Sequence, residues 1–460
     1  MVGFLLLLLV FLAVVVVAVY PKLGAILVWP ILYVYPHLYL YRLDLMPWNI
    51  GIDDLFICAL FLAVLVRRNL SEGIPFRIGL SVVGASTYFV VWSVAHLSGW
   101  MIMPELLPVD IVKPILKGVI FVMFTFALVH IIDDERDLRR AGTAFVVSLT
   151  LAGVTVILHQ IFPEQMVLFT SEKIERYQSW YGQSPRAVGS LVNPNTGAVV
   201  LAMATLFAMK LMRASTAILS KLSFLLCIGV MLIAMVLTES RTGALSLGIV
   251  LLMMVVVSRS RFFAGAVIVA VAGVIVVQPG LFLGFWERIV ATYDPEMGGQ
   301  LGAGLQARLD TWGRYWEEAT VQVWLFGQGR LVPTIQIGFH AHSTYVSALF
   351  IHGIGGVVWF LLFFGTVARR SLRMVRTRLA PFDTVGSAVL WGLAVWAIAG
   401  LTLDLLVPFN PRYVYLFYAV LIERGYALAK QSASASPPND IVERHSFLTQ
   451  SEGNAQHIVG

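Results

Sequence analysis

Long apolar runs recur along this chain, and they constrain its fold more than any other feature. Runs such as "FLLLLLVFLAVVVVAVY" near the start are about as long as the 18–20 residues that a helix needs to cross a hydrocarbon core of roughly 30 Å. Only 13% of the residues are charged, whereas soluble domains carry about 25%. The sequence therefore predicts an all-α, polytopic integral membrane protein.

The apolar runs also predict the domain organisation. We expect about 12–13 transmembrane helices in a membrane domain of residues 1–430, followed by a disordered cytoplasmic tail at 431–460, because that end is polar. The helices are placed near 3–20, 23–40, 50–66, 78–98, 111–132, 142–162, 192–212, 222–238, 241–258, 262–282, 343–366, 384–406 and 412–429.

The distribution of Lys and Arg predicts which loops face the cytoplasm, where short basic loops are enriched. The basic loops are "RRNLSEGIPFR", "DDERDLRR", "KLMRASTAILSK", "SRSR" and "ARRSLRMVRTR", and they fall on alternate turns of the chain. The net charge of +6 thus belongs to helix ends, and no nucleic-acid partner is expected. The outer side then receives residues 101–110, 162–191, 238–243, 407–412 and a long helical loop at 283–341. In that loop, "ARLDTWGRYWEEATVQVWLFG" has the pattern of an amphipathic helix.

Several polar residues gather at the predicted outer ends of the helices. A cation at the membrane edge is costly to keep and is a functional candidate by default. A single one is equally explained as a snorkelling side chain or a helix cap, but a group on one side favours a binding site. The group comprises Arg186, Asn195, Arg241, His342, Arg308, Lys113 and Lys117.

The stretch "HSTYVSALFIHGIGG" starts at His342 and carries two glycines below it. On one continuous helix, Gly353 and Gly356 would lie within about 40° of His342, and small residues let a neighbouring helix approach closely. The spacing predicts a histidine at the outer boundary of a tightly packed helix. His340 and His342 form a His-x-His pair, but no carboxylate or cysteine nearby completes a ligand set, so no metal site is expected.

At these residues the chain resembles the O-antigen ligase and O-antigen polymerase (Wzy-type) superfamily. The signature of that superfamily is His, then Asn, Ser or Gln, nine residues, and Gly-x-x-Gly. Here it is formed by His342, Ser343, Gly353 and Gly356. The stretches "RAVGSLVNPNTGA", "TESRTGAL" and "ARLDTW" follow the order of the family, so the resemblance covers residues 186–356.

The resemblance implies a metal-independent membrane glycosyltransferase without a cofactor. Such an enzyme moves a glycan from an undecaprenyl-diphosphate-linked donor to an acceptor sugar hydroxyl, on the lipid A core or another surface acceptor. The reaction takes place at the periplasmic face of the bacterial inner membrane.

Roles for the candidate residues follow from this chemistry. Arginine binds phosphate oxygens in bidentate fashion, so Arg186 and Arg241 are expected to hold the diphosphate. His342 is expected to activate the acceptor hydroxyl as a base. Weaker substrate-binding candidates are Asn195, Ser343, Arg308, Lys113 and Lys117.

Two other functions remain open at this stage. A polymerase would join lipid-linked repeat units, and the Arg-x10-Gly spacings of Arg186 with Gly197 and Arg288 with Gly299 agree with that activity. The His-Ser and Gly-x-x-Gly match favours the ligase. A transporter of lipid-linked glycans would carry charges at the membrane midplane in paired halves, and the sequence has no such halves.

Overall fold

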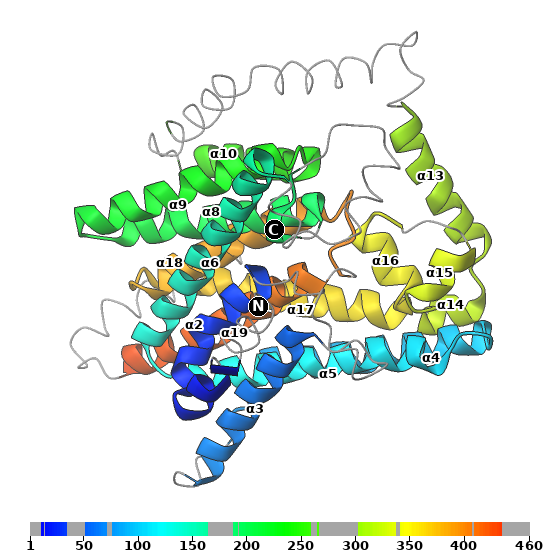
Figure 1. Ribbon diagram of the computed structural model, residues 1–460, viewed down its shortest axis with the longest axis horizontal. Helices are drawn as coiled ribbons and strands as arrows, with labels where there is room; N and C mark the ends of the chain where they lie inside the picture. Colours follow the sequence, from blue (N-terminus) through cyan, green and yellow to red (C-terminus); the bar gives the residue numbers. More distant parts are fainter. Residues whose placement is uncertain are drawn as a thin grey trace, which may run out of the picture.

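The structure is a computed structural model that describes residues 11–12, 14–34, 51–70, 76–163, 187–191, 193–258, 265, 302–336, 341–406 and 409–434. Every regular element within these residues is helical (Figure 1). Seven of the helices described are long and apolar enough to cross a membrane. They are α4 (Leu80–Ile102), α5 (Pro108–Ile131), α6 (Glu135–Ile161), α8 (Pro194–Ala214), α9 (Ile218–Leu237), α17 (Gly353–Thr377) and α18 (Phe382–Ala399). The predicted all-α, polytopic membrane fold is therefore confirmed.

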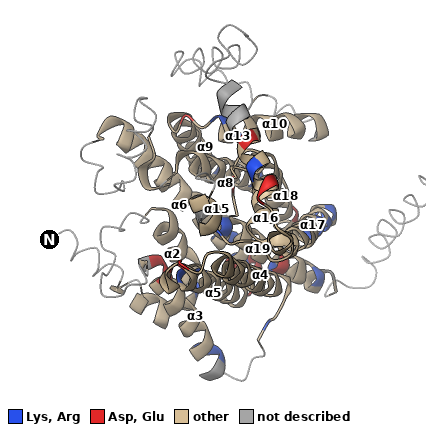
Figure 2. Ribbon diagram, turned by 90° about the vertical axis from the view of Figure 1, so that its right-hand side faces the viewer, with Lys and Arg blue, Asp and Glu red and all other residues tan. Residues whose placement is uncertain are grey.

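The remaining elements complete the bundle or lie at its ends. Figure 2 shows how few Lys, Arg, Asp and Glu positions the helices carry. Among the predicted helices, nearly all of 262–282, much of 3–20 and residues 35–40 of 23–40 lie outside the described residues. The remaining helices are α2 (Pro21–Tyr33), α3 (Ile52–Leu70), α10 (Arg241–Ser258), α13 (Gly302–Glu317), α14 (Val321–Phe326), α15 (Leu331–Gln336), α16 (Thr344–Phe350) and α19 (Phe409–Ser434), with the short 3-10 helix η3 (Gly189–Leu191).

Two helix boundaries differ from the prediction for identifiable reasons. Helix α6 starts inside the charged stretch "DDERDLRR", because the Asp134 carboxylate accepts a hydrogen bond of 2.7 Å from the Asp137 amide and caps the helix. Helix α19 continues through Ser434, beyond the end of the helix predicted at 412–429. Residues 435–460 of the predicted tail lie outside the described part of the chain.

The single helix predicted over 343–366 is wrong, because the structure divides it into α16 and α17. Gly353 has a φ of +68° at the break. A Cβ atom added there would lie 2.6 Å from the Gly327 amide nitrogen, so the chain passes directly over the end of α14. The Gln328 amide also donates to the Phe350 carbonyl at 3.2 Å. His342 consequently does not share one continuous helix with Gly353 and Gly356.

Helices α13, α14, α15 and α16 lie together at one end of the bundle, on the right of Figure 1. The amphipathic helix predicted within 307–327 is divided as well. Helix α13 ends at Glu317, and α14 begins after Thr320, whose hydroxyl accepts a hydrogen bond of 3.4 Å from the Val323 amide.

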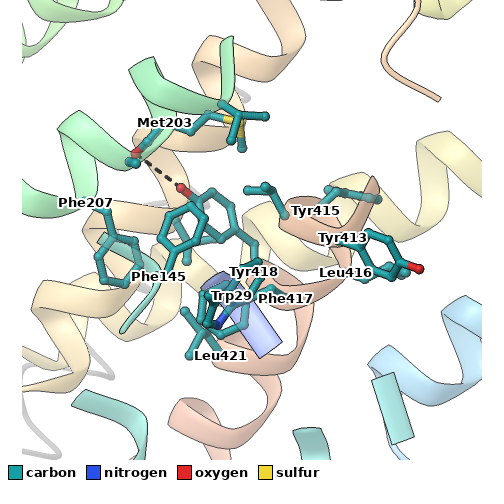
Figure 3. Close-up of a cluster of buried hydrophobic side chains, with 14 of the residues drawn as sticks. Trp29, Phe145, Met203, Phe207, Tyr413, Tyr415, Leu416, Phe417, Tyr418 and Leu421 are labelled. Atoms are coloured by element: carbon teal, nitrogen blue, oxygen red, sulfur yellow. Dashed lines mark hydrogen bonds between the residues drawn. The ribbon is translucent and has the colours of Figure 1, made fainter. Parts of the chain in front are cut away.

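Helix α19 lies in the middle of the bundle and contacts α4, α5, α6, α8, α17 and α18. Its residues 411–422 are all buried. Figure 3 shows Phe417 and Tyr418 among side chains of several helices, with the Tyr418 hydroxyl donating to the Met203 carbonyl at 3.3 Å. The Trp29 ring of α2 lies 4.5 Å from the Phe417 ring. Aromatic packing around α19 thus forms the core.

Two of the predicted cytoplasmic loops, those before α4 and α6, meet at the end of the bundle away from α16. Arg77 pairs with Asp133 at 2.7 Å, and Arg68 approaches the same carboxylate at 3.5 Å. The Arg424 guanidinium donates to the Ile132 carbonyl at 2.6 Å. The basic loops before α4 and α6 therefore lie side by side, as alternate turns of the chain should.

Candidate active site

The start of α16 is fixed to the segment that follows α18, here named loop 400–406. The Thr344 amide donates to the Gly400 carbonyl at 2.8 Å. The Thr344 hydroxyl donates to the Leu403 carbonyl at 2.8 Å and accepts from the Leu405 amide at 2.9 Å. Because Thr344 lies two residues after His342, these bonds determine where the histidine stands.

The starts of α10 and α8 reach the same loop. The hydroxyls of Thr242 and Thr402 are hydrogen-bonded at 3.0 Å. A Cβ added at Gly243 would lie 2.5 Å from the Ala198 Cβ, so the first turn of α10 packs tightly on the first turns of α8. Arg241 and Asn195 therefore belong to adjoining helix starts. The structure brings both to the end of the bundle that carries His342.

His342 has an unusual backbone conformation. Its φ is +48°, in the left-handed region that few residues other than glycine adopt. Its side chain is exposed while the neighbouring Ala341 and Ser343 are buried. The Trp312 indole of α13 donates to the Ala341 carbonyl at 2.6 Å. The chain on both sides of His342 is thus held in place, and the imidazole is turned outward at some conformational cost.

The surroundings of His342 favour a neutral imidazole. Desolvation by the neighbouring protein lowers the pKa of His342 below 6.5, and the positive charge of Arg308 on α13 lowers it further. A neutral imidazole can accept a proton. Arg308 is therefore close enough to His342 to lower the pKa of the imidazole.

Ser343 directly follows His342 in the chain. It is buried, and its hydroxyl donates to the Gly400 carbonyl at 3.4 Å. The side chain thus faces loop 400–406, which favours a structural role over substrate binding. Arg241 is exposed and Asn195 is half-buried at the starts of their helices.

Part of the chain that forms this end of the bundle matches a known protein family. Residues 222–361 match the family model described as O-antigen ligase. This region is therefore similar to the O-antigen ligase family. The resemblance inferred from the His342 motif is therefore confirmed for the part of the chain from α9 into α17. Among curated proteins, none matches the chain significantly.

The O-antigen ligase-like region, residues 222–361, contains Arg241, Arg308, His342 and Ser343, while Lys113, Lys117, Arg186 and Asn195 lie outside it. Lys117 of α5 forms an ion pair with Asp54, and Asp53 lies 3.9 Å away. The pairing with Asp54 favours a structural role for Lys117. Lys113 lies about one turn earlier on α5.

Arg186 lies outside the described residues, so its role stays a prediction. The segment that follows it is packed against the end of α6. The Gly189 amide donates to His159 Nδ1 at 3.1 Å, and the Ser190 amide donates to the Thr155 hydroxyl at 2.9 Å.

Two polar residues at this end of the O-antigen ligase-like bundle were not selected from the sequence. Asp404 in loop 400–406 accepts a hydrogen bond of 2.6 Å from the Ser347 hydroxyl. Arg412 is buried in α19, with its guanidinium carbon 4.4 Å from the Trp92 ring centre and 5.0 Å from that of Phe121. The sequence could have indicated both residues, because each is the single acidic or basic residue in the apolar stretch "LTLDLLVPFNPRYVYL".

Proposed function

We propose that this protein is an O-antigen ligase-like transferase with its active site at the end of the bundle that carries α16. It moves a glycan from an undecaprenyl-diphosphate-linked donor to an acceptor sugar hydroxyl on the lipid A core or another surface acceptor. The reaction occurs at the periplasmic face of the inner membrane and needs no metal. The main support is His342, an exposed imidazole in a left-handed conformation beside Arg308 and at the same end as Arg241.

The residues have complementary roles in this reaction. Neutral His342 accepts the proton of the acceptor hydroxyl while its oxygen attacks the anomeric carbon. The bond to the diphosphate breaks, and the leaving group takes the electron pair. Arg241, together with Arg186, stabilises the negative charge that develops there. A single displacement of this kind inverts the anomeric centre.

The proposal is tested with the full chain reconstituted in lipid vesicles with a lipid-linked glycan and a lipid A core acceptor. Mass spectrometry should detect a new glycosidic bond to the acceptor and released undecaprenyl diphosphate. A ladder of repeat units on the lipid carrier would identify a polymerase instead. Glycan that crosses the membrane without a new bond would contradict the transferase.

The rate of transfer should depend on pH through His342. Because its pKa is lowered from 6.5, the neutral base predominates at neutral pH, and activity should fall as the pH drops through that lowered pKa. Arg308→Gln removes a positive charge, so it should raise the pKa and move the acidic limb to higher pH. The measurement is kcat/KM between about pH 5 and 8 for both proteins.

Arg314→Gln is the matched control, because Arg314 is an exposed arginine on the same helix. It should leave the acidic limb where the wild-type protein has it. An Arg308→Gln enzyme with an unshifted limb would show that His342 is not the titrating base or that Arg308 does not act on it.

A further inference from the structure

We propose that Thr344 is a positioning residue, and that it acts through loop 400–406 to hold the His342 imidazole at a fixed place relative to Arg241. The inference rests on the proposed function, because it assumes that His342 acts on the acceptor. Thr344 itself does not touch the substrate, since it has no exposed surface.

The first support is the way in which Thr344 is bonded. A threonine hydroxyl has one donor and two acceptor sites, and the loop engages both kinds. The hydroxyl joins Leu403 and Leu405, while the amide of the same residue joins Gly400. Three hydrogen bonds thus fix one buried residue to three points of a loop that has no regular structure of its own.

A second contact lies one turn further along α16. The Ser347 hydroxyl donates to Asp404 Oδ2 at 2.6 Å, while Asp404 Oδ1 accepts from the Leu406 amide at 3.1 Å. The start of the loop is also tightly packed, because a Cβ added at Gly400 would lie 3.1 Å from the Thr344 hydroxyl oxygen. The seven-residue helix and the loop are therefore joined at two successive turns.

The third support lies on the far side of the loop. Thr402 binds Thr242, the residue directly after Arg241. The loop therefore contacts a residue next to Arg241 and a residue two positions after His342. If the loop shifts on either side, the distance between guanidinium and imidazole changes. A misplacement of about 1 Å in a reacting group can cost about 100-fold in rate.

The test compares Thr344→Val with Thr344→Ser in the reconstituted transfer assay. Valine keeps the shape but leaves the Leu403 carbonyl and the Leu405 amide without the hydroxyl. We expect kcat to fall by about 10- to 100-fold while the KM for the lipid-linked donor stays within about twofold. Serine keeps the hydroxyl and should recover kcat to within about threefold of the wild-type value.

Thr87→Val is the matched control, since Thr87 is exposed on α4 and its hydroxyl donates to Val83 in the same helix. Its kcat should equal that of the wild-type protein. Thr402→Val removes the half-buried hydroxyl on the other side of the loop and should also lower kcat. Because both valine variants act through one loop, their combined effect should be smaller than the product of the separate effects. All rates are expressed per folded, monodisperse protein.

The outcomes separate the two proposals. If folded Thr344→Val has the wild-type kcat, or if Thr344→Ser is as slow as Thr344→Val, the positioning role is wrong. The same holds if losses merely follow the amount of folded protein. Should Thr344→Val fail to fold, a Thr402→Val enzyme with unchanged kcat overturns the inference. Full activity of His342→Ala would instead overturn the proposed function.

Discussion

Replacement of His342 by alanine should lower glycan transfer by about 10²- to 10⁴-fold and leave the protein folded. In the proposed mechanism the imidazole is the base that takes the acceptor proton, so its removal slows the chemical step. The fold should survive because the side chain is exposed. The rate of product formation in vesicles gives the first quantity, and the elution and thermal denaturation of the purified protein give the second.

The backbone of His342 provides a sharper form of this test. His342→Gly accepts a φ of +48° without the steric cost of a Cβ, so it should be at least as stable as the wild-type protein. His342→Asn also tolerates the left-handed region and keeps hydrogen-bonding groups, yet it cannot act as a base. Both variants should be as inactive as His342→Ala. Near-wild-type transfer by any of the three would refute the assignment.

Replacement of Arg241 by alanine should lower kcat by about 10²- to 10³-fold, as the loss of one donor to a developing anion does in other enzymes. The physical reason is the charge that grows on the diphosphate when the glycosidic bond breaks. Arg241→Lys should be impaired as well, because an ammonium group is a point charge and cannot offer two parallel hydrogen bonds. Steady-state kinetics at varied donor concentration measure both effects.

Arg376→Lys is the control for this pair. Arg376 is exposed in the last turn of α17, and His342 precedes the start of α16, which leads into the first turn of α17. The Arg376→Lys variant should transfer glycan at the wild-type rate. If Arg241→Lys did so too, bidentate binding of the diphosphate by Arg241 would be excluded.

Helix placement was predictable because it depends on local sequence. The segment predicted at 241–258 is observed as Arg241–Ser258, since the apolar run begins after "TES" and ends at a basic stretch. The break before Gly353 was not predictable. Ile351 continues the apolar pattern, yet the chain breaks at Gly353, where the backbone of the distant Gly327 lies against it.

Part of the candidate site was also predictable. The charge of the loops places the starts of α8, α10 and α16 on one side, and the structure brings Asn195, Arg241 and His342 to one end. The sequence analysis did not identify the residues that connect these three. Thr344 and Thr402 are single threonines whose partners lie far away in the sequence, so no local pattern distinguishes them from ordinary packing residues.

The ion pair of Lys117 could not be predicted either, and the sequence analysis therefore named this residue as a candidate substrate-binding cation. Its partner Asp54 lies 63 positions away in another helix, so their pairing is visible only in three dimensions. Charge patterns identify the side of the membrane on which a residue lies, whereas its neighbours depend on how the helices pack.

The central place of α19 has a consequence for biogenesis. This helix follows α4, α5, α6, α8, α17 and α18 in the chain, and yet it fills the space between them. It also carries buried Arg412, a side chain that is costly to place in lipid on a lone helix. Synthesis in chain order leaves the inward faces of these helices without their partner until α19 has been made. We therefore expect Arg412 and those faces to become buried together, when α19 packs between them.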